Sequence, residues 1–352
     1  MRSVVKIINP YDAGDLPEDL KERWGIPLSK IVQLGSNENP YPPPNNLLKK
    51  CSRALRNMNR YPDPKYRKLK SKISEYLNVN EDKISLGCGA SEIIRNICDL
   101  FLEPFDKVII PMPSYTMYIL YSMLKDASIR LLNFPYYNID SSKIDDDFSL
   151  LFICSPNNPT GNAIPKSEIK KILKKSSGYV VVDEAYAEFS NQTVVDFVEK
   201  YDNLIVIRTF SKFFGLAGLR VGYSISSPEV AKNLEKIRLP FGISKIGYIA
   251  AVSALEMVDW FKKIKDKIIN ERERMISELK KLKDIKVFSS DANFVLIKIN
   301  KEINLDDFKK QGIIVRNLKS LYGLEGLHIR VSIGLKKENN KFLSIFKSIL
   351  GE

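Results

Sequence analysis

The sequence predicts an α/β fold in which a large domain with a mostly parallel central sheet is followed by a small α+β domain. Three observations support this prediction. Short, near-continuous apolar runs such as "SLLFIC" and "YVVV" are typical of strands buried on both faces of a parallel sheet. Helical patterns separate several of these runs. After residue 227 the pattern changes to long amphipathic helices and then to short strands and helices.

The chain has 352 residues, which is long for a single hydrophobic core. We expect an N-terminal segment over residues 1–45 that packs on the small domain and the active site. A large domain should cover residues 46–230, and a long helix with the small domain should cover residues 231–352. The first segment ends in "GSNENPYPPP" and should be irregular, because no stable helix can cross that proline-rich stretch.

The expected elements follow one another along the chain. Residues 65–77 have helical spacing, and residues 83–91 form a brief strand that runs into glycines and then a helix, "EIIRNICDLFL". The next strand candidates are "KVIIPMPSY", "IRLLNFPY", "SLLFICSPNN", "YVVVDEAY" and "NLIVIRTFS". Two helical stretches begin with "PEVAKNLEKIRL" and "IGYIAAVSALEMV", and the C-terminal strands are "IKVFSS", "NFVLIKI" and "HIRVSIG".

The composition is that of an ordinary globular protein, with 44% hydrophobic and 28% charged residues, which argues against disorder. The N-terminal apolar run is broken by Lys6 and is too short for a signal peptide, and no window is apolar enough to span a bilayer. Four cysteines without a C-x-x-C pair and a single histidine give no metal-ligand spacing. We therefore expect no metal and a reducing, cytoplasmic location.

The formal net charge of +13 has two interpretations. A basic face could bind nucleic acid, which would make this a non-catalytic binding protein. The lysines, however, are spread over helical stretches such as residues 166–175, and no arginine-aromatic cluster matches a nucleic-acid module. We favour a lysine-rich solvated surface and expect no nucleic-acid partner.

Polar side chains follow the ends of the predicted strands, where ligands bind in open α/β sheets. The residues at these ends, in chain order, are Gly89, Ala90, Ser91, Tyr115, Asn157, Asn158, Asp183, Tyr186, Ser211 and Lys212, of which Gly89 and Ala90 offer only backbone groups. Taken singly, several have a structural explanation: the glycine string is a tight turn with a helix cap, and "NNPTG" is a good turn sequence. Asp183 and Lys212 are harder to explain this way, because a charge in an apolar setting needs a partner. The "GCGASE" string lacks the third glycine of a dinucleotide fingerprint.

Pyridoxal phosphate would satisfy these groups together. Lys212 would form the Schiff base with its aldehyde, and Asp183 would keep its ring nitrogen protonated, which makes the ring an electron sink. Asn158 and Tyr186 would hydrogen-bond the phenolic oxygen, and Tyr115 would stack on the ring. The groups expected around the phosphate are Gly89, Ala90, Ser91, Ser211 and Arg220.

The motifs "SPNNPTG", "VVDEAY", "RTFSKFFGLAGLRVGY", "ANFVLIKI" and "HIRVSIG" resemble those of fold-type I pyridoxal-phosphate aminotransferases over nearly the whole chain. Within that superfamily, "SNENPYPPP", "RYPDP" and "GIIVR" are similar to the histidinol-phosphate aminotransferase family. That family transfers an amino group between L-histidinol phosphate and 2-oxoglutarate in histidine biosynthesis. The resemblance implies a pyridoxal-phosphate-dependent transaminase.

The resemblance also implies residue roles. Tyr61 in "RYPDP" would reach the cofactor phosphate of a neighbouring subunit, so a homodimer is expected. Arg330 and Arg316 would hold the anionic group of the substrate, and Tyr11 and Asn39 would line the substrate pocket. Ser91 departs from the family, because an aspartate is common at that position.

Two related activities stay open on the sequence alone. One is an L-threonine-O-3-phosphate decarboxylase of cobalamin biosynthesis, which would use the same lysine with the substrate rotated. The other is an aromatic-amino-acid aminotransferase. The "NENP" and "GLAGLR" segments favour the histidinol-phosphate transaminase.

Overall fold

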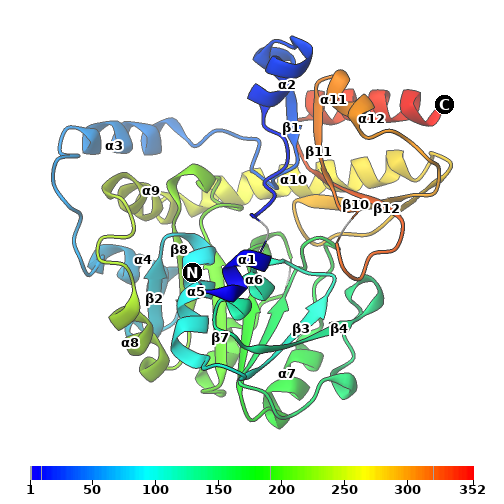
Figure 1. Ribbon diagram of the computed structural model, residues 1–352. Helices are drawn as coiled ribbons and strands as arrows, with labels where there is room; N and C mark the ends of the chain where they lie inside the picture. The colour runs from blue at the N-terminus through cyan, green and yellow to red at the C-terminus, as the bar shows by residue number, and fades with distance from the viewer. Residues whose placement is uncertain (1, 9, 191, 320) are drawn as a thin grey trace.

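The computed structural model describes residues 2–8, 10–190, 192–319 and 321–352, and its strands form two sheets. The seven-stranded sheet lies in the lower half of Figure 1, and the five-stranded sheet lies above it to the right. Helix α10 (Val258–Leu279) runs across the molecule between them. It packs against α9 (Lys245–Leu255) and η5 (Ala187–Phe189), and against β10 (Phe294–Ile299) and α12 (Lys336–Leu350).

The larger sheet has the strand order β2-β8-β7-β6-β5-β3-β4. Only β8 (Gly222–Ile225) is antiparallel to its neighbours, so the predicted mostly parallel sheet is confirmed. The parallel strands are β2 (Ile84–Gly87), β3 (Lys107–Met112), β4 (Ser128–Asn133), β5 (Leu150–Cys154), β6 (Tyr179–Asp183) and β7 (Leu204–Thr209).

Helices cover both faces of this sheet, which explains the continuous apolar runs. In β6, Val181 belongs to the buried cluster on one face, whereas Val180 and Val182 belong to the cluster on the other. The first face is covered by α5 (Gly89–Phe101), α6 (Met117–Met123) and α8 (Pro228–Ile237). The opposite cluster includes residues of α3 (Asn45–Leu55), α4 (Arg67–Leu77), α7 (Lys166–Lys175), α9 (Lys245–Leu255) and α10.

The smaller sheet has the order β1-β11-β12-β10-β9 and combines both ends of the chain. Strand β1 (Val32–Leu34) is parallel to β11 (Ile313–Asn317), and the remaining pairs are antiparallel. The other members are β9 (Ile285–Val287), β10 (Phe294–Ile299) and β12 (Leu327–Ser332), and the adjoining helices are α11 (Asp306–Lys310) and α12 (Lys336–Leu350). The predicted C-terminal α+β region is therefore present, with β1 added to it.

The expectation that residues 1–45 are irregular is wrong in part. This segment contains α1 (Ser3–Ile7), α2 (Pro17–Trp24) and β1, although no helix crosses residues 35–44. Helix α2 begins with a proline at its first turn and ends at Gly25, whose φ of +65° is available to glycine at little cost. Short 3-10 turns occur at η1 (Leu28–Lys30), η2 (Glu81–Lys83), η3 (Pro135–Tyr137), η4 (Ser141–Lys143), η5 (Ala187–Phe189), η6 (Val195–Glu199) and η7 (Ala217–Leu219).

The domain boundary at residue 230 stays a prediction. Helix α8 packs against β2, η2 and α5, and α9 packs against α3 and α4, so both helices after the change in pattern remain with the larger sheet. Within the described ranges, no helix is both long and apolar enough to cross a membrane. The same residues contain no cluster of three or more histidine, cysteine or acidic side chains suited to a metal ion.

Candidate active site

A cavity of about 390 Å³ lies at the carboxyl ends of β5, β6 and β7. Its walls come from the larger sheet, from the N-terminal segment and from β11 and β12 of the smaller sheet. The residues singled out from the sequence that line it are Tyr11, Ala90, Ser91, Tyr115, Asn158, Asp183, Tyr186, Ser211, Lys212, Arg220, Arg316 and Arg330. The fold therefore brings into one cavity groups that are spread over most of the chain.

Lys212 lies just after the end of β7, and a hydrogen bond holds its side-chain amine in place. Its Nζ donates a hydrogen bond to the carbonyl oxygen of Ser36 at 2.9 Å and lies 5.8 Å from the centroid of the Tyr186 ring. Burial, with a further contribution from the positive charge of Arg330, lowers the pKa of Lys212 to about 8. An appreciable fraction of this amine is thus neutral and nucleophilic near neutral pH.

Asp183 is the last residue of β6 and is 4% exposed. Its Oδ1 accepts from the backbone N–H of Ala185 at 3.1 Å, and its Oδ2 accepts from the hydroxyl of Tyr118 at 2.8 Å. Burial raises the pKa of Asp183 to about 6, and these two hydrogen bonds oppose the increase. A carboxylate has about four lone-pair sites, so this side chain can still accept a hydrogen bond from a protonated ring nitrogen.

Asn158 and Tyr186 are both oriented by residues of the N-terminal segment and the smaller sheet. Arg330 donates from its guanidinium to Oδ1 of Asn158, which keeps the amide nitrogen available as a donor. Asn37 donates from Nδ2 to the Tyr186 hydroxyl at 3.0 Å, and burial raises the pKa of Tyr186 above its usual value. Tyr186 therefore remains a neutral phenol whose own proton can be donated.

The first turn of α5 and Arg220 form the anion-binding end of the cavity. Gly89 opens this helix with φ +77°, and a Cβ at that position would lie 2.6 Å from a terminal nitrogen of Arg220. A Cβ on Gly222 would lie 2.6 Å from the carbonyl carbon of Gly89. The two glycines let the guanidinium and the strand approach the exposed N–H groups of the helix, an arrangement suited to a phosphate dianion.

Arg316 and Arg330 are register partners on β11 and β12, and both border the cavity. Arg330 is 8% exposed and donates to the carbonyl oxygen of Gly35 and to Asn158. Among the described residues, its Nε has no hydrogen-bond partner and no acidic side chain pairs with it. A buried cation without an acidic partner is costly, so this position suits an anionic ligand.

The N-terminal segment contributes to the cavity more than the sequence indicated. Ser36, Asn37 and Glu38 line it together with Tyr11, and Asn293 donates from Nδ2 to the carbonyl oxygen of Asn37 at 3.0 Å. The "SNENP" string quoted from the sequence contains these residues, but no local pattern showed which of its side chains face the cavity. Tyr118 was also missed, because a tyrosine in an apolar helix looks like an ordinary core residue.

The expectation that Asn39 binds substrate stays a prediction. Its Nδ2 donates to the carbonyl oxygen of Phe213 at 3.0 Å, its Oδ1 accepts from the N–H of Tyr41 at 3.0 Å, and it does not line the cavity. This hydrogen bond to Phe213 fixes the loop that follows Lys212. Gly89 also does not line the cavity; it lies close to Arg220, and its role at the cofactor stays a prediction.

Tyr61 lies outside the cavity of its own chain. It is 76% exposed and stacks on Phe241, with the ring centroids 4.2 Å apart. Its expected contact with the phosphate of a neighbouring subunit stays a prediction.

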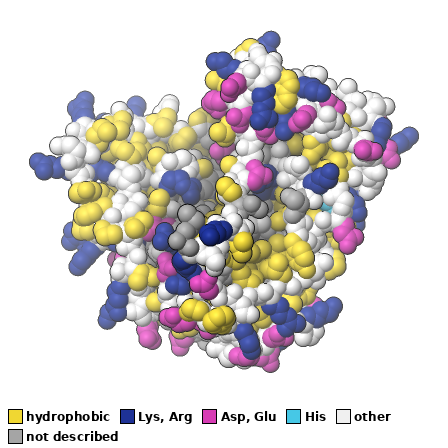
Figure 2. All heavy atoms as spheres, viewed as in Figure 1, with side chains coloured by type: hydrophobic (Ala, Val, Ile, Leu, Met, Phe, Trp, Pro, Cys, Tyr) yellow, Lys and Arg dark blue, Asp and Glu magenta, His cyan; other side chains and the backbone are white. Residues whose placement is uncertain are grey.

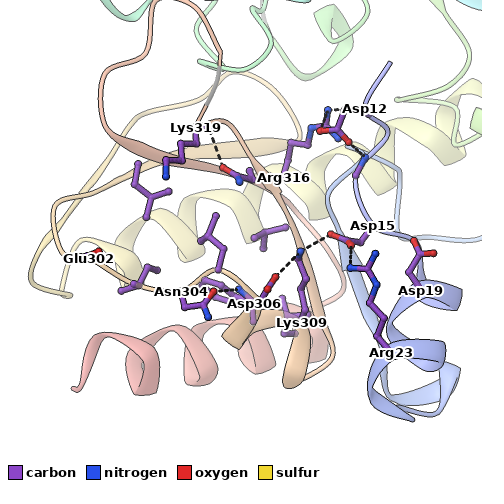
Figure 3. Close-up of a pocket in the computed structure, with 18 of the residues that line it drawn as sticks. Asp12, Asp15, Asp19, Arg23, Glu302, Asn304, Asp306, Lys309, Arg316 and Lys319 are labelled. Carbon is purple, nitrogen blue, oxygen red and sulfur yellow. Dashed lines mark hydrogen bonds and ion pairs between the residues drawn. The ribbon is translucent and has the colours of Figure 1, made fainter. Parts of the chain in front are cut away.

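A second, larger cavity of about 760 Å³ lies between the α2 segment and α11 (Figure 3). Its charges compensate one another: Asp15 lies 3.0 Å from Lys309 and 3.7 Å from Arg23, and Lys309 lies 2.8 Å from Asp306. Arg316 borders both cavities, and it also donates to the carbonyl oxygen of Asp12. Because several of its charged groups pair with one another and the residues singled out from the sequence lie mostly in the smaller cavity, we place the active site there.

The residues of the smaller cavity fit pyridoxal phosphate. A nucleophilic amine, a buried carboxylate, two donors for a phenolic oxygen and a glycine-lined anion site occur together. The buried Arg330 is an additional cation beyond the one at the anion site, as a cofactor and an anionic substrate together would require. The individual roles of these residues stay predictions.

Comparison with known proteins gives consistent results. The model of the family "Aminotransferase class I and II" matches residues 29–344. The chain is 46% identical over 350 residues to histidinol-phosphate aminotransferase 2 of Archaeoglobus fulgidus, covering 99% of this chain and all of that one. Among solved structures, the histidinol-phosphate aminotransferase of Clostridium acetobutylicum is 32% identical with a TM-score of 0.84, covering 91% of this chain and 99% of that one. The fold also matches that of the enzyme from Sinorhizobium meliloti in complex with pyridoxal-5'-phosphate, with a TM-score of 0.89, 24% identity, and coverage of 100% and 97%.

Proposed function

Because this chain belongs to the histidinol-phosphate aminotransferases, within the class I and II aminotransferase family, we propose that its amino donor is L-histidinol phosphate. The amino acceptor would be 2-oxoglutarate, and the products would be imidazole acetol phosphate and L-glutamate. This reaction belongs to histidine biosynthesis. The observation that carries the proposal is the joint presence of Lys212, Asp183 and the buried Arg330 in one cavity.

The chain is a pyridoxal-phosphate-dependent transaminase. When bound, the cofactor supplies an aldehyde that condenses with amines and a pyridinium ring that withdraws electrons from the α-carbon of the substrate. Lys212 would hold the cofactor in the resting enzyme. Asp183 would hold the proton on the ring nitrogen, and Asn158 and Tyr186 would donate to the phenolic oxygen.

Lys212 would also act as the base. Its Nζ has a pKa lowered to about 8, so it can be neutral when it removes the proton from the α-carbon of the substrate. Its present partner, the Ser36 carbonyl oxygen at 2.9 Å, shows one position that the amine can occupy in the cavity. The pose in which the protein holds a substrate would decide whether its α-proton or, in a substrate that has one, its α-carboxylate is lost.

The two arginines would set that pose. Arg330 is buried and Arg316 lies beside it on the next strand, so one anionic group can be bound between them. The same guanidinium groups can accept the phosphate of histidinol phosphate and a carboxylate of 2-oxoglutarate. Two substrates that use one site in turn give ping-pong kinetics.

One assay separates this proposal from its alternatives. Histidinol phosphate, threonine phosphate and phenylalanine are supplied separately with 2-oxoglutarate, and glutamate and carbon dioxide are measured, with Lys212→Ala as the inactive control. We expect glutamate with histidinol phosphate as the best donor. Carbon dioxide from threonine phosphate without glutamate, or glutamate formed only with phenylalanine, would replace the proposed activity by one of the two alternatives.

We also propose that the active form is a homodimer. Exposed apolar side chains gather on the flank formed by α3 and the neighbouring loops, where Figure 2 shows hydrophobic side chains side by side. This apolar flank consists of Leu48, Leu55, Met58, Tyr61, Ile237 and Leu239. A patch of this kind on a globular protein favours a protein partner. The partner proposed here is a second copy, which would receive Tyr61 at its phosphate site.

Subunit mixing tests the dimer. Lys212→Ala and Tyr61→Ala are each expected to have low activity, and mixing them under exchange conditions should restore activity, because one of the two hybrid sites has both residues intact. No recovery in a mixture that forms hybrid dimers would contradict the shared site. A cytoplasmic location is also proposed, since the four cysteines, all in the described part of the chain, are free.

A further inference from the structure

Tyr118 is buried directly behind the carboxylate of Asp183. It lies in α6, is fully buried, and donates its hydroxyl proton to Oδ2 of Asp183 at 2.8 Å. Its ring is stacked on Phe152 of β5, with centroids 4.9 Å apart and planes 6° apart. The phenol is therefore held in place by packing that does not depend on its hydroxyl.

The surroundings of Tyr118 fix the direction of this hydrogen bond, with the phenol as the donor. Burial and the adjacent Asp183 carboxylate raise the pKa of Tyr118 well above its usual value, so the phenol always carries the proton it donates. Among the described residues, Tyr118 supplies the one side-chain hydrogen bond to Asp183, and the backbone of Ala185 supplies the other. The other titratable groups that face Asp183 are Lys212, Glu184, Tyr186, Tyr115, Tyr137 and Cys154.

A buried carboxylate facing a ring nitrogen can share one proton with it in two ways. With the proton on nitrogen, both groups are charged, and with the proton on the carboxylate, both are neutral. Burial alone favours the neutral pair, because desolvation penalises charge. A hydrogen bond donated to the carboxylate favours its ionised form and so shifts the proton towards the nitrogen.

We propose that Tyr118 is a positioning residue of this transaminase, whose hydroxyl keeps Asp183 ionised and oriented towards the ring nitrogen of the cofactor. The inference deepens the proposed function and rests on it. It explains why a phenol stands at this place in an apolar helix, where a phenylalanine would fill the same space.

The apoprotein provides a direct test that does not use catalysis. The carboxyl carbon of Asp183 is followed by ¹³C NMR over a pH titration, and its signal is assigned by its loss in Asp183→Asn. The wild-type midpoint is expected at about 6. In Tyr118→Phe it should rise by roughly one to two pH units, the effect of one hydrogen bond to a charged group. Tyr121→Phe removes a phenol from the same helix that does not contact Asp183 and should leave the midpoint unchanged.

The holoenzyme provides the second readout. Tyr118→Phe should lower kcat roughly tenfold while changing KM much less, because Tyr118 does not line the cavity in which the substrates would bind. An unchanged Asp183 midpoint in Tyr118→Phe would overturn the inference whatever the kinetics show. If Tyr118→Phe does not fold, Tyr118→Leu, which also removes the hydroxyl and keeps an apolar side chain, is titrated instead, and an unchanged Asp183 midpoint there overturns the inference in the same way. Failure of the proposed function would appear separately, as wild-type protein that does not transfer the amino group of histidinol phosphate.

Discussion

Replacing Arg208 by methionine should destabilise the protein strongly, because it leaves two buried carboxylates without a cation. Arg208 is 4% exposed and donates to Glu184 and Glu188, at 2.9 Å in each case, and to Thr193 at 2.8 Å. Glu184 follows Asp183 in the chain, and Arg208 shortly precedes Lys212. The cluster therefore ties together the ends of β6 and β7, from which both functional side chains extend.

The expected loss follows from the burial of these charges. Breaking a buried ion pair by removing one partner costs about 3–5 kcal/mol, a large part of the roughly 5–15 kcal/mol by which a typical protein is stable. Burial already raises the pKa of Glu188, and Arg208 opposes the increase. Without the guanidinium, the pKa of Glu188 should rise further.

The pH dependence of the loss has a definite sign. A carboxyl group whose pKa is raised in the folded protein destabilises it at pH values above that folded pKa, where the group is ionised. Protonation relieves this destabilisation as the pH falls through the folded pKa towards the unfolded value of about 4.3. The difference in unfolding free energy between wild type and Arg208→Met should therefore be largest near about pH 8 and smaller near about pH 5.

Urea unfolding of the apoproteins, followed by circular dichroism at both pH values, measures this difference. Arg208→Lys should lie between the two, because it keeps the charge and loses the planar fork. The matched control is Lys262→Met, which removes an exposed partner lying 3.0 Å from Asp259 and should cost less than about 1 kcal/mol. An Arg208→Met variant within about 1 kcal/mol of wild type at pH 8, or a deficit that grows on acidification, would refute the reasoning.

Other substitutions test the cavity itself. Gly222→Ala should weaken binding of pyridoxal phosphate at least roughly tenfold, because its Cβ would meet the start of α5 at 2.6 Å. An affinity equal to that of wild type by fluorescence titration would contradict the anion site. Arg330→Lys should lower kcat/KM for both substrates roughly a hundredfold in steady-state kinetics, since an ammonium cannot replace the planar guanidinium. A loss for one substrate alone would argue against a shared site. The rate at which apoprotein binds pyridoxal phosphate should rise with pH around a midpoint of about 8, because the neutral amine of Lys212 is the reacting form. A midpoint near the ordinary lysine pKa would show that the pKa of this amine is not lowered.

Most strands of the larger sheet were predictable because they are buried on both faces, whereas the edge strand β4 alternates between exposed and half-buried residues. A run such as "YVVV" has to be covered on two sides, and only helices on both faces of a parallel sheet do so. Strand β8 and strand β1 were not predicted. Strand β8 follows a glycine-rich loop without a helical crossover, and the three residues of β1 pair with β11 near the other end of the chain, a contact that no local pattern encodes.

The cavity residues at strand ends were predictable because the strands that carry them are parallel. Carboxyl ends of parallel strands meet at one edge, so Asp183 and Lys212 had to lie near each other. The side chains of the loop after β1 could not be assigned this way. Within "SNENP", Asn37 and Glu38 face the cavity and Asn39 faces the backbone after Lys212, a choice made by long-range contacts to Ser332 and Phe213.

The amine of Lys212 is the group that should carry the cofactor, and its covalent attachment can be measured directly. Purified protein loaded with pyridoxal phosphate is reduced with borohydride, digested and mapped by mass spectrometry. We expect the pyridoxyl group on the peptide that contains Lys212 and its absence from that peptide when histidinol phosphate is added before the reduction. A pyridoxyl group fixed on another lysine, or on none, would contradict the account.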